Sequence, residues 1–199
     1  MRIIGLTGGI AAGKSTISHY LREWGAVIID TDILARELVV PYSAAWQEIV
    51  KHFGEDILTP DGYLKRKRLG EIIFKSAGQR RVLNEILHPQ IKERTLQLLS
   101  FYRQKKVPLV ILVAPLLIEA EMMDLVDEIW LVAVPEKLQL KRLQERDNLS
   151  EKEALDRIRA QLPLKEKLKY AAQVIDNSGT ESETRQKVLT LWKKTIKQV

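Results

Sequence analysis

A glycine-rich segment near the N-terminus has the residue types and the spacing of a site that holds phosphate groups. Residues 8–15 read GGIAAGKS, which is glycine, four residues, glycine, lysine and serine. Gly8 and Gly13 allow torsions and close approaches that a Cβ atom would prevent, so successive N–H groups can point at phosphate oxygens. Lys14 can reach the β and γ phosphates, and the Ser15 hydroxyl can hold Mg²⁺, which prefers oxygen ligands. The segment therefore predicts binding of a nucleotide together with Mg²⁺.

Two carboxylates follow the second apolar run of the chain. Asp30 and Asp32 lie at the carboxyl end of residues 26–30, which we expect to form a strand. In an open parallel sheet, ligands bind at the edge formed by the carboxyl ends of the strands. A carboxylate there could accept the proton of an attacking hydroxyl group, while its neighbour holds Mg²⁺ through water. We predict that Asp32 is catalytic, with a helix N-cap as its alternative role, and that Asp30 is structural or linked to the metal.

Other features narrow the class of nucleotide-binding protein. The apolar run at 107–113 continues into Ala114 and Pro115 and lacks the acidic residue that many ATPases of this type place there, which argues against a motor. The sequence contains no Asn-Lys-x-Asp element, so a GTPase is a weak interpretation. A kinase is favoured. A nucleoside or nucleoside-monophosphate kinase and a non-enzymatic, nucleotide-regulated binding module both stay open as alternatives.

Arginines gather in the charged segment that follows the fourth apolar run. Arg142 and Arg146 stand four residues apart on one face of a predicted helix, and two more arginines lie within residues 157–159. Guanidinium groups on a mobile helix could neutralise charge on a transferring phosphoryl group and exclude water. The alternative is a solvated face on which Glu145 and Asp147 are the partners. We favour a functional role for Arg142, because phosphoryl transfer needs positive charge near the transferred group.

Two basic residues in the middle of the chain could contact the acceptor of the phosphoryl group. Arg36 lies one turn beyond Asp32, and His88 precedes Pro89 at what we predict to be a junction between two helices. Either side chain could grip a phosphate of the acceptor. A helix cap is the alternative role for His88.

The elements that must position these residues follow from the apolar periodicity. Short apolar runs predict five parallel strands, at residues 2–6, 26–30, 107–113, 128–134 and 174–176. The first two are joined by a helical crossover and are expected to pair with each other, and the third and fourth are expected to be central. The predicted fold is a three-layer α/β fold with a five-stranded parallel sheet, of the type named P-loop after its phosphate-binding loop.

Helical patterns fill most of the remaining chain. They are expected at 14–24, around 118–125, from Pro135 to about 170 and at 181–196. Residues 32–105 are almost wholly helical in pattern, with predicted breaks at Pro41, 59–62, Ser76 and His88-Pro89.

Composition limits the cellular setting and the partners. The 199 residues suit one domain, and the absence of cysteine fits a reducing compartment, so we expect the cytoplasm. The net charge of +6 suits anionic partners, but the basic residues are interspersed with acids, so nucleic-acid binding is not expected. The apolar run at the N-terminus leads straight into the glycine-rich loop, and residues 107–118 are too short to cross a bilayer. No membrane association is expected.

Taken in order, the motifs make the chain resemble the dephospho-CoA kinase family from end to end. Only the glycine-rich loop is widely shared among P-loop proteins, whereas the remaining segments together are specific to this family. The matching segments are LTGGI at 6–10, KST at 14–16, DTD at 30–32, AR at 35–36, LHP at 87–89, PLLIE at 115–119, QLKRLQER at 139–146 and IDNSG at 175–179.

The resemblance implies a magnesium-dependent transfer of the γ-phosphate of ATP to the 3′-hydroxyl of dephospho-CoA, the last step of coenzyme A synthesis. Asp32 would be the catalytic base, assisted by Lys14 and Arg142, and Ser15 would bind the metal. The acceptor would be bound by Asp32, Arg36 and His88. The residues implied to bind ATP are Gly8, Ala11, Ala12, Gly13, Lys14, Ser15, Thr16, Arg142 and Asn177.

The family's organisation implies a single P-loop kinase domain over residues 1–199 that acts as a monomer on small-molecule substrates. Its nucleotide-binding core would comprise residues 1–32, 106–135 and 171–199, its helical acceptor-binding subdomain 33–105, and its lid 136–170. Ala11 and Ala12 stand where the family usually has glycine and serine, and Ala172 where it often has aspartate. The changes at 11 and 12 keep the backbone N–H groups, so phosphate binding is expected to survive them.

Overall fold

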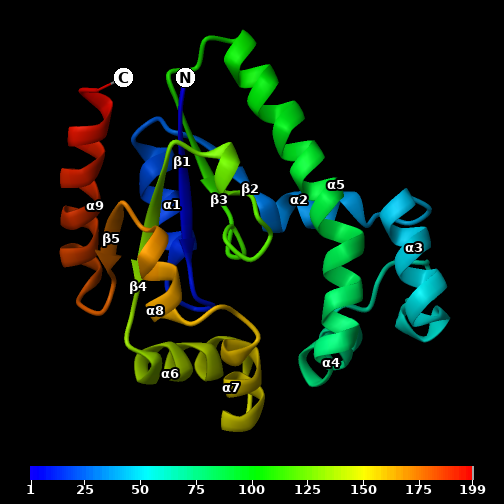
Figure 1. Cartoon of the computed structure of the whole chain (residues 1–199). Helices are drawn as coiled ribbons and strands as arrows, with labels where there is room; N and C mark the ends of the chain where they lie inside the picture. Colours follow the sequence, from blue (N-terminus) through cyan, green and yellow to red (C-terminus); the bar gives the residue numbers. More distant parts are fainter. Residues whose placement is uncertain (199) are drawn as a thin grey trace. The chain divides into compact units, whose positions relative to one another are not determined.

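The computed structural model describes residues 1–198, and the chain forms two compact units. Unit 1 contains residues 1–30 and the chain from Leu98 onward, whereas unit 2 contains Thr31–Gln97. Figure 1 shows a sheet with flanking helices in unit 1 and helices in unit 2. Among the described residues, no helix combines the length and the apolar character that crossing a membrane would require.

Unit 1 is built on a five-stranded parallel sheet, as the sequence predicted. The order across the sheet is β2-β3-β1-β4-β5. The strands are β1 (Arg2–Gly8), β2 (Val27–Asp30), β3 (Leu109–Val113), β4 (Glu128–Ala133) and β5 (Gln173–Asp176).

The predicted pairing of the first two strands is wrong, because β3 lies between β1 and β2 and pairs with both. All five residues of β3 are buried, whereas β2 is shorter and partly exposed. A strand that is apolar along its whole length needs cover on both faces, and a central position supplies it. The predicted central positions of β3 and β4 are confirmed.

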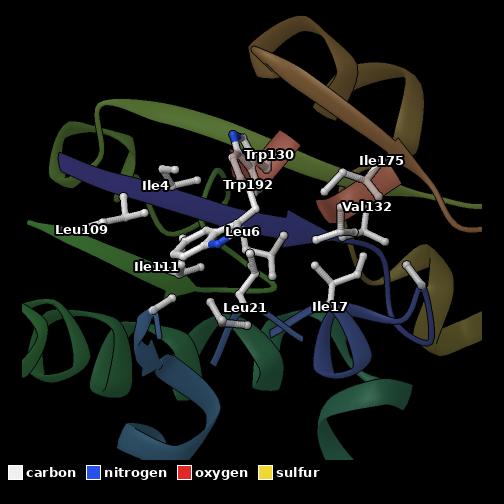
Figure 2. Packing of buried hydrophobic residues seen from close by; sticks show 14 of the residues in the cluster. Ile4, Leu6, Ile17, Leu21, Leu109, Ile111, Trp130, Val132, Ile175 and Trp192 are labelled. Atoms are coloured by element: carbon white, nitrogen blue, oxygen red, sulfur yellow. The ribbon is translucent and has the colours of Figure 1, made fainter. Parts of the chain in front are cut away.

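Two helices cover one face of this sheet. They are α1 (Lys14–Glu23) and α9 (Glu181–Ile196). Leu6 and Trp130 from the strands share one buried apolar cluster with Leu21 of α1 and Trp192 of α9 (Figure 2). Because Ile4 and Leu6 alternate with residues on the other face, the cluster anchors β1 and therefore the loop that follows it.

The segment after β3 departs from the prediction. Instead of a helix over 118–125 it forms turns and a short 3₁₀ helix, η2 (Met123–Leu125). Glu121 has a φ of 51°, a left-handed conformation that interrupts a right-handed helix.

The charged segment after Pro135 is helical but divided. It forms α6 (Glu136–Asp147), α7 (Glu151–Arg159), α8 (Leu164–Lys167) and η3 (Leu168–Tyr170). Asn148, with a φ of 51°, ends α6, and the Ser150 side chain forms a capping box with Glu153 that begins α7.

Unit 2 is helical, and its own apolar cluster includes the buried residues Ile49, Ile57, Leu69 and Leu83. Its elements are α2 (Thr31–Leu38), α3 (Ala44–Phe53), η1 (Glu55–Ile57), α4 (Arg66–Lys75) and the greater part of α5 (Ala77–Gln104).

The predicted break at His88-Pro89 is wrong, because α5 runs through Pro89 without interruption. A proline inside a helix removes one backbone donor and crowds the preceding turn, a cost of about 3 kcal/mol. A helix of 28 residues has many other hydrogen bonds to set against that cost. His88 therefore lies inside a helix and does not cap one.

Candidate functional site

The glycine-rich loop connects β1 to α1 and reaches α1 through Gly13. Gly13 has a φ of 97°, which favours glycine, and a Cβ atom there would collide with the side-chain amide of Asn177. The loop also contains a turn in which the Ala12 N–H donates to the Gly9 carbonyl at 3.2 Å, with Ala11 at a φ of 57°. Gly13 thus has the left-handed conformation and the close approach that the sequence predicted for the glycines of the loop. A further left-handed conformation falls on Ala11.

The carbonyl groups of the loop are held by protein donors. Lys14 Nζ donates to the carbonyl oxygens of Gly8 and Gly9, at 2.8 and 2.9 Å. Asn177 Nδ2 donates to the Ala12 carbonyl at 2.7 Å, and Asn177 Oδ1 accepts from the Thr184 hydroxyl at 2.8 Å. In a trans peptide the C=O and the next N–H point in opposite directions. Holding the Ala12 carbonyl therefore also orients the N–H of the residue that follows.

A cavity of about 310 Å³ lies beside this loop. It brings together residues that the sequence placed in an ATP site but that lie up to 166 positions apart, since Ala11 and Asn177 both line it. The lining residues are Ala11, Gly13, Thr16, Tyr20, Arg142, Asn177, Gly179, Glu181 and Thr184. Three segments of unit 1 thus contribute to one cavity: the loop with α1, helix α6, and the turn from β5 into α9.

The arginines of α6 have different surroundings. Arg142 is half-buried and lines the cavity. Arg146 is exposed and donates two hydrogen bonds to Asp147, at 2.8 and 3.0 Å, and Arg157 of α7 donates to the same carboxylate at 2.9 Å. The hydrogen bonds from Arg146, together with the charge of Arg157, lower the pKa of Asp147. The ion pair between Arg157 and Asp147 thus joins α7 to α6, whereas Arg142 lines the cavity.

The wall of the cavity contains a buried phenol. The Tyr20 hydroxyl donates to Glu181 Oε1 at 2.8 Å, and the Arg185 guanidinium lies 5.5 Å from the centre of the tyrosine ring. Burial, with the hydrogen bond to Glu181, raises the pKa of Tyr20. The phenol therefore stays a neutral donor at physiological pH, and it fixes the start of α9 against α1.

Ser15 and Asp30, the two residues that the sequence analysis linked to Mg²⁺, both belong to unit 1. Ser15 is exposed in the first turn of α1, and Asp30 ends β2 at the register of Val113 on the neighbouring strand. Within residues 1–198, no group of three or more His, Cys, Asp and Glu side chains could hold a metal ion by itself. A hydroxyl and a carboxylate fit Mg²⁺ that arrives with ATP, because such an ion takes one or two protein oxygens and fills its shell with phosphates and water.

Asp32, Arg36 and His88 belong to unit 2. Asp32 lies in the first turn of α2 and Arg36 in the last, four residues apart, and both are exposed. This spacing places them on the same face of the helix. His88 is half-buried within α5.

A buried ion pair near the glycine-rich loop was not predicted from the sequence. Lys167, which ends α8, has a side chain only 1% exposed, and its Nζ lies 2.8 Å from Glu119 Oε1 and 3.0 Å from the Pro115 carbonyl. Glu119 Oε1 also accepts from the Leu162 N–H at 2.9 Å, while its Oε2 is buried without a hydrogen bond. The pair ties the segment after α7 to the loop after β3. Sequence reasoning had no signal for it, because Lys167 sits in a run of charged residues that looks solvated.

Comparison with known proteins places this arrangement in a family. Residues 2–183 match the family model of dephospho-CoA kinase. The chain is 48% identical to dephospho-CoA kinases of Carboxydothermus hydrogenoformans, over 96% of this chain and 93% of that one, and of Geobacter metallireducens, over 98% of each.

Solved structures agree with the sequence relatives. A dephospho-CoA kinase from Campylobacter jejuni superposes with a TM-score of 0.71 at 26% identity, over 98% of both chains. A shikimate kinase from Acinetobacter baumannii, at 20% identity and a TM-score of 0.55, shares the fold over 98% of this chain and 94% of its own. The chain therefore belongs to the dephospho-CoA kinase family.

Proposed function

We propose that this protein transfers the γ-phosphoryl group of ATP to the 3′-hydroxyl of dephospho-CoA. The observation that carries the proposal is the cavity in which the glycine-rich loop, Arg142 and Asn177 meet, in a chain that matches dephospho-CoA kinases over almost its whole length. Main-chain N–H groups and the dipole of α1 favour a triphosphate beside the loop. ATP is thus the donor, bound by Gly8, Arg142, Asn177 and residues 11–16.

Transfer needs a proton acceptor and a stabiliser of negative charge. As the 3′-oxygen forms its bond to the γ-phosphorus, the bond from that phosphorus to the β-γ bridging oxygen breaks and ADP leaves. We assign to Asp32 the role of taking the proton from the 3′-hydroxyl. Lys14 and Arg142 neutralise charge on the phosphoryl oxygens, where cations in a partly dehydrated site have their largest effect.

Mg²⁺ is the cofactor that this chemistry needs, and the Ser15 hydroxyl is its protein ligand in the proposal, with Asp30 linked to it through water. When bound, the ion would draw negative charge from the phosphate oxygens. Arg36 and His88 are proposed to bind the acceptor, within a helical subdomain at 33–105. Residues 136–170 are proposed to act as a lid that carries Arg142 over the nucleotide.

A coupled assay that follows ADP release tests the proposal against its alternatives. Turnover with dephospho-CoA, and little with nucleosides or nucleoside monophosphates, is the expected result. Turnover with nucleosides or monophosphates instead would identify a nucleoside or nucleotide kinase. Binding of ATP without turnover on any acceptor would favour a nucleotide-regulated binding module.

The proposed setting is a monomer in the cytoplasm. The absence of cysteine suits a reducing compartment, and one chain supplies every side chain assigned to the reaction. Light scattering of the purified protein during gel filtration measures the mass, and a dimer that stays intact at low concentration would contradict the monomer.

A further inference from the structure

Two glutamines from different parts of the charged helical segment hold one residue of the glycine-rich loop. Gln161, which follows α7, accepts the N–H of Ile10 through its Oε1 at 2.7 Å. Gln139 of α6 donates from its Nε2 to the Ile10 carbonyl, also at 2.7 Å. A backbone N–H can only donate and a backbone C=O can only accept, so these partners determine which end of each side-chain amide is oxygen and which is nitrogen.

These hydrogen bonds orient the two peptide groups that flank Ile10. In a trans peptide, a C=O that points toward Gln139 turns the N–H of Ala11 away from Gln139. Likewise, the Ile10 N–H that points to Gln161 turns the Gly9 carbonyl the other way, where it accepts from Lys14 Nζ and from the Ala12 N–H. The two glutamines therefore fix the orientation of the peptide groups in the first half of the loop. Asn177 does the same for the second half through its hydrogen bond to the Ala12 carbonyl.

The glutamines lie behind the loop and not in the nucleotide cavity. They line a separate cavity of about 120 Å³ together with Gly9 and Lys167, whereas Ala11, Gly13 and Arg142 line the cavity of about 310 Å³. The smaller cavity has room for a few water molecules. A Cβ atom on Gly9 would come within 2.5 Å of Gln139 Nε2, so this close approach depends on glycine.

The left-handed conformation of Ala11 makes the hydrogen bond from Gln139 important for the shape of the loop. Its φ of 57° costs an alanine roughly 1 to 2 kcal/mol, since only glycine adopts this conformation freely. Rotation of the peptide between Ile10 and Ala11 would relieve that strain and would turn the Ala11 N–H toward Gln139. The hydrogen bond from Gln139 opposes this rotation.

We propose that Gln139 and Gln161 are positioning residues that aim the loop's N–H groups at the triphosphate, and that they couple the segment carrying Arg142 to the loop. The coupling is direct, because Gln139 and Arg142 lie three residues apart on α6. A shift of α6 relative to the loop would change the loop's hydrogen bonds and the position of Arg142 together. This inference rests on the proposed use of ATP as the phosphoryl donor.

Two matched variants test the polarity of these hydrogen bonds. Gln139→Glu replaces the donor to the Ile10 carbonyl with an acceptor, whereas Gln161→Glu keeps an acceptor for the Ile10 N–H. Each adds one negative charge beside the same residue, so the repulsion of phosphate is similar in both. We expect Gln139→Glu to raise the Kd for Mg-ADP, measured by calorimetry, about tenfold more than Gln161→Glu does. The KM for dephospho-CoA should change less than about twofold in either variant.

A neutral series keeps the test decisive if the charged variants fail to fold. Gln139→Met preserves the length of the side chain and should weaken Mg-ADP binding by at least about fivefold. Gln144→Met is the control on the same helix, because the Gln144 side chain donates to the nearby Leu149 carbonyl and lines neither cavity, and it should leave ADP affinity unchanged. Thermal unfolding of each variant verifies that it is folded at the assay temperature.

The outcomes separate this inference from the proposed function. Equal losses in Gln139→Glu and Gln161→Glu, or wild-type ADP affinity in Gln139→Met, would overturn the positioning role even if dephospho-CoA is phosphorylated. If the wild-type protein binds ADP but leaves dephospho-CoA unmodified, the choice of acceptor fails while the ADP comparison can still be made. If it does not bind ADP, both proposals fail.

Discussion

The glycine-rich loop of unit 1 and helix α2 of unit 2 present their proposed chemistry in different ways. The loop offers main-chain N–H groups, and side chains remote in sequence hold its carbonyls, among them Gln139 and Asn177. Helix α2 offers the exposed side chains of Asp32 and Arg36, four residues apart on a helix that begins directly after β2.

This difference separates the effects that substitutions should have. A change in a residue that supports the loop should act through stability and ATP affinity, because the loop's N–H groups are proposed to bind the donor in the ground state as well as in the transition state. A change at an exposed reacting side chain should act on turnover and leave folding intact. The predictions below test this division, from the largest expected effect to the smallest.

Loss of the buried cation behind the loop should destabilise the protein most. Lys167→Met leaves Glu119 in a poorly solvated place without its partner, and breaking a buried pair in this way typically costs about 3 to 5 kcal/mol. Urea unfolding measures the loss. The double variant Lys167→Met with Glu119→Gln should recover part of it, because no unpaired charge is left behind. An unchanged midpoint in the single variant would contradict the stabilising role assigned to this ion pair.

Removal of the proposed base should reduce turnover without weakening the donor's binding. Asp32→Asn is expected to lower kcat on the order of 100-fold or more, because the amide cannot take the proton of the acceptor hydroxyl. The Kd for Mg-ADP and the unfolding midpoint should stay close to wild type, because Asp32 is exposed on α2. Near-normal turnover would remove Asp32 from the role of base. A large loss of ADP affinity would contradict the expectation that substitutions on α2 change turnover and leave binding of the donor intact.

Substitution of Asn177 should lower both the stability of the protein and its affinity for ATP. Asn177→Leu has similar bulk but removes the donor to the Ala12 carbonyl and the acceptor for Thr184, so we expect a loss of roughly 1 to 3 kcal/mol in stability and a raised KM for ATP.

Thr184→Val is the matched control for Asn177. It removes only the hydrogen bond between Thr184 and Asn177, and it should lower stability while changing ATP affinity less than Asn177→Leu does. Equal effects of the two variants on the KM for ATP would show that Asn177 does not act through the loop.

The smallest effect should come from the exposed turn next to Asn177. Asp176 accepts hydrogen bonds from Ser178 and lies 2.9 Å from Lys187 Nζ, and these interactions, led by Ser178, lower its pKa to about 2. Because the folded state lowers this pKa, the stabilisation is present above the unfolded value of 3.8 and is lost as pH falls toward about 2. Solvent screens this exposed group, so Asp176→Asn should cost less than about 1 kcal/mol at pH 7.

Urea unfolding at pH 7, 4 and 3 checks this prediction. The gap between wild type and Asp176→Asn should narrow as the pH falls, and a gap that widens would contradict the sign of the shift. Lys187→Met removes the ion pair but keeps the hydrogen bonds from Ser178, so it should show only part of the effect.

Much of the fold could be predicted from the sequence because local patterns encode it. The five apolar runs predicted the five parallel strands, and α1 and α9 begin where the sequence predicted them. The errors arose where long-range packing or one residue's conformation overrode a local signal. Pro89 is tolerated inside α5, Glu121 interrupts the helical pattern after β3, and β3 takes the place beside β1 that was expected for β2.

For the site, the sequence alone determined which chemical groups are available: a loop whose glycines expose main-chain N–H groups, a lysine and a serine beside it, and carboxylates at the end of the second strand. These groups could be identified from the sequence because the members of each motif lie within a few residues of one another. Only the tertiary structure decided what holds the loop in shape. Gln139, Gln161 and Asn177 reach it from positions more than 120 residues away, and the hydrogen bond between a side-chain amide and a remote peptide leaves no periodic pattern in sequence.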